Sequence, residues 1–280
     1  MQQLSCSNAI HSMNNIELEH PKIVSQDKWL VARKAHLERE KALTRLRDQV
    51  SAERRELPWV KIEKNYVFVT PNGKKTLADR FDGRSQLIVY HFMFGPSVRD
   101  GKEGCKSCSF LVDHVDGANV HLAHHDVTFV AISRTPLSQI EPFKNRMGWR
   151  FKWVSSYGSD FNYDFHVSAT KDELAKGRMY YNYEMVEFQC EEQPGISVFY
   201  KDKSGDIFHT YSSYGRGGDI LTRHVQLSRP HPLRSPGGEG TRDGMGTAPR
   251  QVRLRQRRKG GHSDSQSCSP IAFLALPLPT

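Results

Sequence analysis

The sequence lacks the features that would place it in a membrane or among secreted disulfide-rich proteins. No apolar run approaches the roughly 20 residues that a membrane helix needs. The opening MQQLSCSNAIHSMNN contains neither the basic segment nor the long apolar segment of a secretory signal peptide. Five cysteines in 280 residues, odd in number and irregularly spaced, do not indicate a disulfide framework. We therefore expect a cytoplasmic protein, in a reducing compartment, without a membrane partner.

A strong charge of either sign is also missing from most of the chain. The formal net charge is +9, but residues 222–280 hold ten Lys or Arg and three Asp or Glu, so they carry +7 and leave +2 for the rest. The part before residue 222 therefore offers no electrostatic reason to expect a nucleic-acid partner. A basic run at 253–259 could contact phosphates non-specifically. We consider that role the less favoured interpretation of the tail.

Most of the residues that could take part in catalysis or metal binding lie in the stretch 86–125. Residues 86–94 (QLIVYHFMF) are rich in β-branched and aromatic side chains and are bounded by glycines, which predicts a buried strand. Residues 95–104 predict a loop, with a lid over the first cysteine as the alternative to a solvated connection. A helix is expected from Cys108 to about His125, because apolar residues recur at helical spacing. These residues are Leu111, Val115, Ala118 and Leu122.

The other expected elements suggest one fold. In chain order they are a helix over 27–56, a strand over 59–70, a turn at 71–73, a short helix over 76–81, a strand over 127–133, a helix over 137–147, a short strand over 151–155, a helical turn over 159–165 and a hairpin over 196–200 and 206–212. The strands over 86–94 and 127–133 predict a right-handed βαβ unit. With the Cys-x-x-Cys motif after the first of them, the order predicts an α/β thioredoxin-like fold, a mixed central sheet flanked by helices.

Composition divides the chain into four parts. Residues 1–25 show no periodicity and are expected to be flexible, and residues 26–57 form a charged helical extension that should lie solvated across the domain. Residues 58–220 hold the thioredoxin-like domain. Residues 221–280 are a basic low-complexity tail rich in Arg, Gly, Pro and Ser, which predicts disorder.

The candidate chemistry lies in Cys105 and Cys108. A dithiol oxidoreductase needs an accessible thiolate to attack a disulfide and a second thiol close enough to resolve the mixed disulfide. A helix N-terminus favours an anion, and Lys106 adds a nearby positive charge. We interpret Cys105, at the exposed end, as the attacking thiol and Cys108, one turn into the helix, as the resolving thiol.

Metal binding is the main competing chemistry, and we expect neither a metal nor a cofactor. His114, His121 and His125 fall on one stripe of the predicted helix. In a continuous helix His121 would lie roughly 20 Å from Cys108, too far for one coordination shell. His91, inside an apolar strand, is expected to be a hydrogen-bonded core histidine.

Four segments carry a resemblance to a known family: LPWVKIEKNYVFVTPNGKKTLADRFDGRSQLIVYHFMFGP, EGCKSCSF, MGWRFKWVSSYGSDFNYDF and PGISVFYKDKSGDIFHTYSSYGRG. They resemble the thioredoxin-like family catalogued as domain of unknown function 899, over about residues 24–219. The resemblance implies a thioredoxin-like fold with Cys105 and Cys108 as the redox site. It also implies that Pro194 takes the cis-proline position beside the dithiol, where backbone can pair with a bound substrate chain. An ordinary trans proline is the alternative.

The sequence departs from the family's pattern after Gly218-Asp219. We interpret the change as a frame change or an unspliced segment in the gene, which would remove or replace the last helix of the domain.

The function expected from the sequence is thiol–disulfide exchange. The partners would be a protein or small-molecule disulfide and an unidentified reductant. One alternative is a peroxiredoxin-like thiol peroxidase, because KKTLADRFDGRSQLIVYHF also resembles the start of peroxiredoxins. The residues before Cys105 nevertheless lack the Pro-x-x-x-Thr/Ser-x-x-Cys setting of a peroxidatic cysteine. The other alternative is a non-catalytic thioredoxin-like binding module whose dithiol is a remnant or a zinc half-site. Cys190 is expected to be a buried or semi-exposed thiol, with pairing to the dithiol as the less favoured alternative.

Overall fold

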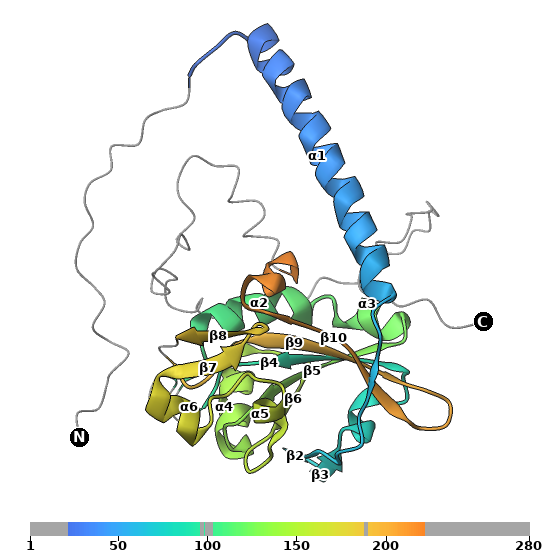
Figure 1. Ribbon diagram of the computed structural model, residues 1–280, viewed down its shortest axis with the longest axis vertical. Helices are drawn as coiled ribbons and strands as arrows, with labels where there is room; N and C mark the ends of the chain where they lie inside the picture. The colour runs from blue at the N-terminus through green and yellow to red at the C-terminus, as the bar shows by residue number, and fades with distance from the viewer. Residues whose placement is uncertain (1–21, 96–97, 99–102, 188–189, 222–280) are drawn as a thin grey trace, which may run out of the picture.

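The protein, described by a computed structural model over residues 22–95, 98, 103–187 and 190–221, is built on one eight-stranded sheet (Figure 1). The strand order is β1-β10-β9-β4-β5-β6-β2-β3, and β7 and β8 form a separate pair. In chain order the elements are α1 (Gln26–Arg55), β1 (Val60–Lys61), β2 (Val67–Thr70), β3 (Gly73–Thr76), the 3₁₀ helix η1 (Ala78–Phe81), β4 (Gln86–His91), α2 (Lys106–Asp116), α3 (Asn119–His124), β5 (Val127–Ser133), α4 (Leu137–Met147), β6 (Lys152–Ser155), α5 (Phe161–Asp164), α6 (Lys171–Lys176), β7 (Arg178–Tyr181), β8 (Glu184–Glu187), β9 (Gly195–Lys201), β10 (Ile207–Tyr214) and the 3₁₀ helix η3 (Gly215–Leu221).

The centre of the sheet is β4, in which all six residues are buried. It pairs in parallel with β5 and antiparallel with β9, while β5 pairs in parallel with β6. Strands covered on both faces carry nearly continuous apolar runs, as β4 and β5 do. The predicted βαβ unit and the predicted hairpin, β9–β10, are therefore confirmed. The order β5-β4-β9-β10, with β4 and β5 parallel and β9 and β10 antiparallel, makes the fold thioredoxin-like.

Alternate residues of β4 enter two separate cores, because side chains alternate between the faces of a strand. Ile88 and Tyr90 pack into a cluster with apolar residues of α2 and α4. Leu87 and Val89 pack on the other face, against a cluster that includes residues of η1 and α5. The sheet is thus covered by helices on both faces, as the sequence predicts.

The segment 59–70 is two strands, and its prediction as one strand was wrong. β1 pairs with β10 at one edge of the sheet, whereas β2 pairs with β3 and β6 near the opposite edge. The polar residues 63–65 between the two strands are exposed and cross from one edge toward the other. The predicted turn at 71–73 is confirmed, because Thr70 pairs with Gly73 across the β2–β3 hairpin.

The helix expected to run to His125 is broken after Asp116. Two hydrogen bonds join the last turn of α2 to the residues just before β6. The Asp116 carboxylate accepts the backbone N–H groups of Arg150, at 2.8 Å, and Phe151, at 3.0 Å. Gly117 caps α2, and α3 begins at Asn119. The distance along one continuous helix that was used to separate His121 from Cys108 therefore does not apply to this structure.

Helix α1 confirms the predicted helix but does not lie across the domain. It extends away from the sheet (Figure 1), and none of its residues is buried. At its end, the Arg54 guanidinium lies 5.3 Å from the centroid of the Tyr211 ring. The sequence of α1 is dominated by Arg, Lys and Glu and has no wide apolar stripe to bury against the sheet.

Several predictions for the ends of the chain lie outside the described residues. The flexible segment expected over 1–25 falls mostly on residues 1–21, and the disordered tail falls on 222–280. Residues just beyond β10 form η3, whose Gly218 is packed closely enough that a Cβ there would lie 3.2 Å from Leu111 Cδ1 of α2. None of the described helices is both long and apolar enough to cross a membrane.

His91 is a core histidine, as expected. Its side chain is 1% exposed, its Nε2 lies 2.9 Å from Ser197 Oγ, and its ring stacks near those of Phe161 and Phe165, at centroid distances of 5.5 and 5.8 Å. Burial, with a smaller contribution from His209, lowers the pKa of His91 to about 3. The folded protein therefore holds this imidazole neutral across the physiological range.

His91 should make the folded state less stable in mild acid. The unfolded chain takes up a proton on His91 below about pH 6.5, but the folded chain does not until about pH 3. We expect wild type to lose about 1.4 kcal/mol per pH unit relative to His91→Asn between those limits. Urea unfolding at several pH values, followed by the fluorescence of the buried Trp149 and Trp153, measures the difference.

The matched control is His36→Asn, which removes an exposed histidine on α1. It should keep the wild-type slope. Equal slopes for wild type and His91→Asn would contradict a neutral His91.

Candidate functional site

The two cysteines lie at the carboxyl end of β4, where the chain enters α2. Cys105 is the N-cap residue of α2, and Cys108 lies in the first turn of the helix. The backbone N–H of Cys105 donates to the carbonyl of Met93, at 3.0 Å, which ties the helix start to the chain just beyond β4. Both cysteines are therefore where the sequence places them, at the start of the helix that follows the central strand.

The two thiols differ in their access to solvent. Cys105 is half-buried, whereas Cys108 is only 1% exposed, and neither sulfur is in a disulfide bond. Burial raises the pKa of Cys108 well above its usual value, and its neighbour Cys105, which lies within hydrogen-bonding reach, raises it further. The intervening Lys106 and Ser107 are exposed. A reagent in solvent can thus reach one thiol, and the second thiol lies directly behind it.

Gly104 sets how closely the chain approaches the core before Cys105. A Cβ at this position would lie 2.6 Å from Cε1 of Phe92 and 3.1 Å from Cε1 of Phe143. Real Cβ atoms do not approach neighbouring carbons this closely, so a larger residue would have to displace the aromatic rings or the chain. The glycine therefore fixes the path of the backbone into α2. The sequence shows a glycine here, but only the structure shows what it packs against.

Tyr90 is a site residue that sequence reasoning missed. It lies on β4, is 3% exposed, and its hydroxyl is within hydrogen-bonding reach of the Cys108 thiol. Burial, followed by the nearby Cys108, raises the pKa of Tyr90 well above its usual value, so the hydroxyl keeps its proton. The alternation of side chains along β4 was a usable signal, because it puts Tyr90 on the face that α2 covers.

Pro194 lies at the same edge of the sheet, but its peptide bond is trans. Gly195 pairs with His91 at the end of β4, so Pro194 comes immediately before the strand that borders β4. The described residues contain no cis peptide bond. The expected cis-proline was therefore wrong for this chain. The trans isomer is the intrinsically favoured one by about 0.5–1 kcal/mol, and the sequence around Pro194 carries no signal that reverses this preference.

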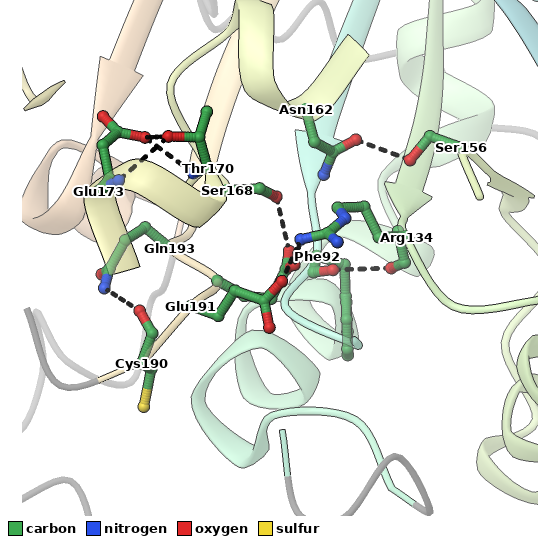
Figure 2. Close-up of polar contacts among 12 residues, drawn as sticks. Phe92, Arg134, Ser156, Asn162, Ser168, Thr170, Glu173, Cys190, Glu191 and Gln193 are labelled. Carbon is green, nitrogen blue, oxygen red and sulfur yellow. Dashed lines mark hydrogen bonds and ion pairs between the residues drawn. The ribbon is translucent and has the colours of Figure 1, made fainter. Parts of the chain in front are cut away.

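A buried ionic cluster precedes Pro194. Arg134, which follows β5, lies 2.7 Å from carboxylate oxygens of both Glu191 and Glu192. The Ser168 hydroxyl donates to Glu192 at 3.0 Å. Figure 2 shows Arg134 and Ser168 directed toward the same carboxylate region beside Glu191. These residues are far apart in the sequence, and no local pattern points to their meeting.

Glu192 is the most buried member of this cluster, at 1% exposure. Burial raises its pKa to about 7, although Arg134 and Ser168 act in the opposite direction. A Cβ on Gly95 would lie 3.0 Å from the Glu192 side chain, so the carboxylate packs against the first residue of the loop that leads to Cys105. The cluster therefore supports both the start of that loop and the segment before Pro194.

The remaining candidate ligands do not gather around the dithiol. His114 Nδ1 lies 2.7 Å from the carbonyl of Phe110 on its own helix. Cys190 is half-buried, and its carbonyl accepts from the Gln193 side chain at 3.2 Å (Figure 2). Within the described part of the chain, no three His, Cys, Asp or Glu side chains group so as to hold a metal ion.

Solved structures that resemble this chain include several peroxiredoxins. A cysteine-to-serine mutant of PrxQ from Xylella fastidiosa is 11% identical, with a TM-score of 0.38, and the match covers 61% of this chain and 96% of that one. The peroxidoxin BcpB from Mycobacterium tuberculosis is 10% identical, with a TM-score of 0.36 and coverage of 64% and 99%. The mitochondrial 2-Cys peroxiredoxin from Plasmodium falciparum is 12% identical, with a TM-score of 0.34 and coverage of 63% and 96%. No curated protein matches the sequence.

The family relationship covers most of the chain. The sequence model of one family, described as a bacterial protein of unknown function (DUF899), matches residues 18–228. The match includes the whole described sheet, both cysteines of the dithiol and Pro194. It confirms the family that the four sequence segments indicate and extends beyond them at both ends. The chain belongs to the DUF899 family.

Proposed function

We propose that the protein is a thiol–disulfide oxidoreductase that uses Cys105 and Cys108. The observation that supports this most is the asymmetry of the pair: the half-buried Cys105 stands at the N-cap position of α2, and the buried Cys108 thiol lies within hydrogen-bonding reach behind it. Thiol–disulfide exchange by a dithiol needs this combination, because one sulfur must meet the substrate and the other must reach the first sulfur.

Exchange proceeds in two displacements. The Cys105 thiolate attacks one sulfur of a substrate disulfide, forms a mixed disulfide and expels the other sulfur as a thiolate, which takes up a proton. Cys108 then loses its proton and attacks the Cys105 sulfur, which releases the second substrate thiol. The Cys105–Cys108 pair is oxidised by two electrons and the substrate disulfide is reduced to two thiols. An external thiol reductant restores the dithiol by the reverse exchange.

The surroundings of the two sulfurs suit these separate roles. The N-terminus of α2 and the positive charge of Lys106 favour a thiolate on Cys105. The raised pKa of Cys108 keeps that thiol protonated while Cys105 attacks. When Cys108 becomes the attacking group, the Tyr90 hydroxyl is in position to donate a hydrogen bond to its developing thiolate.

The two alternatives predict different measurements. A thiol peroxidase would consume peroxide at the expense of an added thiol, although the residues before Cys105 lack the peroxidatic pattern. A non-catalytic binding module would show no thiol-dependent turnover of either disulfide or peroxide. Assays of both reactions with the full chain therefore separate the three functions.

Replacing each cysteine singly should stop the exchange at a different step. The starting protein carries Cys6→Ser, Cys190→Ser and Cys268→Ser, so that only the dithiol remains. With the chromogenic disulfide dithiobis-nitrobenzoate, this protein should release about two thiolates per chain and end as the internal disulfide. Adding Cys108→Ser should leave about one thiolate and a stable mixed disulfide on Cys105. Adding Cys105→Ser should slow the reaction by a factor on the order of a hundred, because Cys108 is buried.

Mass spectrometry of the products identifies the adduct in each variant, and circular dichroism shows whether each variant is folded. A folded Cys108→Ser variant that forms no adduct on Cys105 would overturn the assignment of the attacking thiol. Peroxide consumption in place of disulfide turnover would favour the peroxidase.

Gly104→Ala should impair the dithiol through the backbone. The added methyl group meets Phe92 and Phe143, so we expect a loss of about 1–3 kcal/mol in stability and slower alkylation of Cys105. Alkylation by iodoacetamide, measured in the variant that has only the dithiol, reports the reactivity. Gly117→Ala, at the other end of α2 where a Cβ meets nothing within 4 Å, is the matched control. Equal rates in the two variants would show that Gly104 does not position Cys105.

A further inference from the structure

The backbone beside a reactive disulfide site decides whether a polypeptide can dock there as an added strand. Such docking needs N–H and C=O groups of the receptor that are not already paired. β4 lies in the interior of the sheet, and the two outer strands, β1 and β3, lie at its opposite ends. Close to the dithiol, a docked strand could therefore pair only with the backbone that follows β4 or precedes β9.

The chain before β9 is already paired with another segment of the same protein. Gln193 donates its backbone N–H to the carbonyl of Val167, at 2.8 Å, and the carbonyl of Glu191 accepts from the N–H of Ala169, at 2.9 Å. Between these two bonds, Ser168 and Glu192 form an antiparallel bridge. The backbone N–H of Gln193, immediately before Pro194, is therefore already used in an internal hydrogen bond.

The carbonyl of Pro194 is occupied as well. It accepts from the Tyr181 hydroxyl at 2.6 Å, and the same hydroxyl accepts from the N–H of Gly215 at 2.7 Å. Tyr181 belongs to the β7–β8 hairpin, which Figure 1 shows lying over this end of the sheet. The hairpin therefore occupies a backbone acceptor at the position where the family resemblance would place a bound substrate chain.

The ionic cluster holds the internal pairing in place. Ser168 and Glu192 are joined through their side chains as well as their backbones, and Arg134 joins Glu192 to Glu191. Glu192 and Ser168 are both buried. A polypeptide that competed for the backbone of Gln193 would have to expose this cluster or leave its polar groups unpaired, which is costly.

Two backbone groups just beyond β4 are also used. The N–H of Phe92 donates to Ile132, at 2.9 Å, and the carbonyl of Met93 accepts from Cys105, at 3.0 Å. Cys105 itself remains half-exposed. Among the residues that the structure describes, the site thus offers a reachable sulfur without backbone arranged beside it to pair with a substrate strand.

We propose that the substrate of the Cys105–Cys108 dithiol is a low-molecular-weight disulfide, recognised at the sulfur, and not a polypeptide held by strand pairing. This inference rests on the proposed exchange function. The first step is the attack of Cys105 on the small disulfide and the release of one small thiol; the second is closure of the Cys105–Cys108 disulfide and release of the other.

A series of substrates that differ only in peptide length tests the inference. Each is a mixed disulfide between nitrothiobenzoate and a cysteine, first as free cysteine and then at the centre of peptides of increasing length. We expect kcat/KM for the full-length protein, with a dithiol reductant present, to stay level or fall as the peptide grows. The uncatalysed rate comes from the same series with Cys105→Ser.

A second series replaces the peptide residues that flank the cysteine by their N-methylated forms, which cannot donate the hydrogen bonds of a paired strand. We expect these substitutions to leave kcat/KM unchanged. An increase of about tenfold or more with peptide length, lost on N-methylation, is what backbone pairing would produce and would overturn the inference. A similar increase that survives N-methylation would also overturn it, because it would show recognition of polypeptide side chains.

Failure of the proposed function has a different result. If free cysteine and every peptide react only at the rate seen with Cys105→Ser, the dithiol does not catalyse exchange, and the substrate inference falls with it. If the shortest disulfide is turned over but insulin is reduced more efficiently per disulfide, exchange stands and the low-molecular-weight assignment is wrong.

Discussion

The burial of β4 is the constraint on which the rest of the structure depends. Its six residues are covered on both faces and paired on both sides, so neighbouring strands and helices must be supplied from distant parts of the chain. β5 and β9 satisfy its backbone, α2 and α4 cover one face, and η1 and α5 cover the other. The chain leaves β4 at its carboxyl end and enters α2 at the dithiol.

The difference between the two thiols follows from the geometry of the helix start. Cys105 caps α2 outside its first turn, and Cys108 comes three residues later on the face that carries Leu111, Val112 and Val115 into the core. Burial alone therefore separates a reachable sulfur from a protected one. Tyr90 and the backbone of Met93 then provide polar partners for the protected sulfur, so that its burial does not leave it without a hydrogen-bonding group.

The segment between β6 and β9 changes what the thioredoxin-like sheet can bind. It contributes α5, α6 and the β7–β8 hairpin, and it returns as residues 191–193 paired with 167–169. Arg134 and Glu192 stabilise that return beside Gly95, which follows β4. The pairing that supports the reactive end of the sheet also uses the backbone N–H of Gln193, next to Pro194. The pairing of residues 191–193 with 167–169 thus both supports the site and limits strand pairing beside it.

The sequence by itself determined the features that local patterning controls. Apolar runs located β4 and β5, helical spacing located α1, α2 and α4, and the apolar setting of His91 was enough to predict a core histidine. The position of the two cysteines at a helix start also followed from local spacing. These predictions succeeded because each depends on which side of its own strand or helix a residue lies.

Only the tertiary structure decided the features that join distant segments. The two halves of 59–70 look like one strand until their partners at opposite edges are known, and the break between α2 and α3 coincides with contacts from Asp116 to residues 150 and 151. Arg134 meets Glu192 across 58 residues, and Val167 occupies the N–H of Gln193. Periodicity reports whether a side chain is buried, but it carries no record of the partner. The dithiol could therefore be located from the sequence, whereas the internal pairing of the backbone beside Pro194 could not.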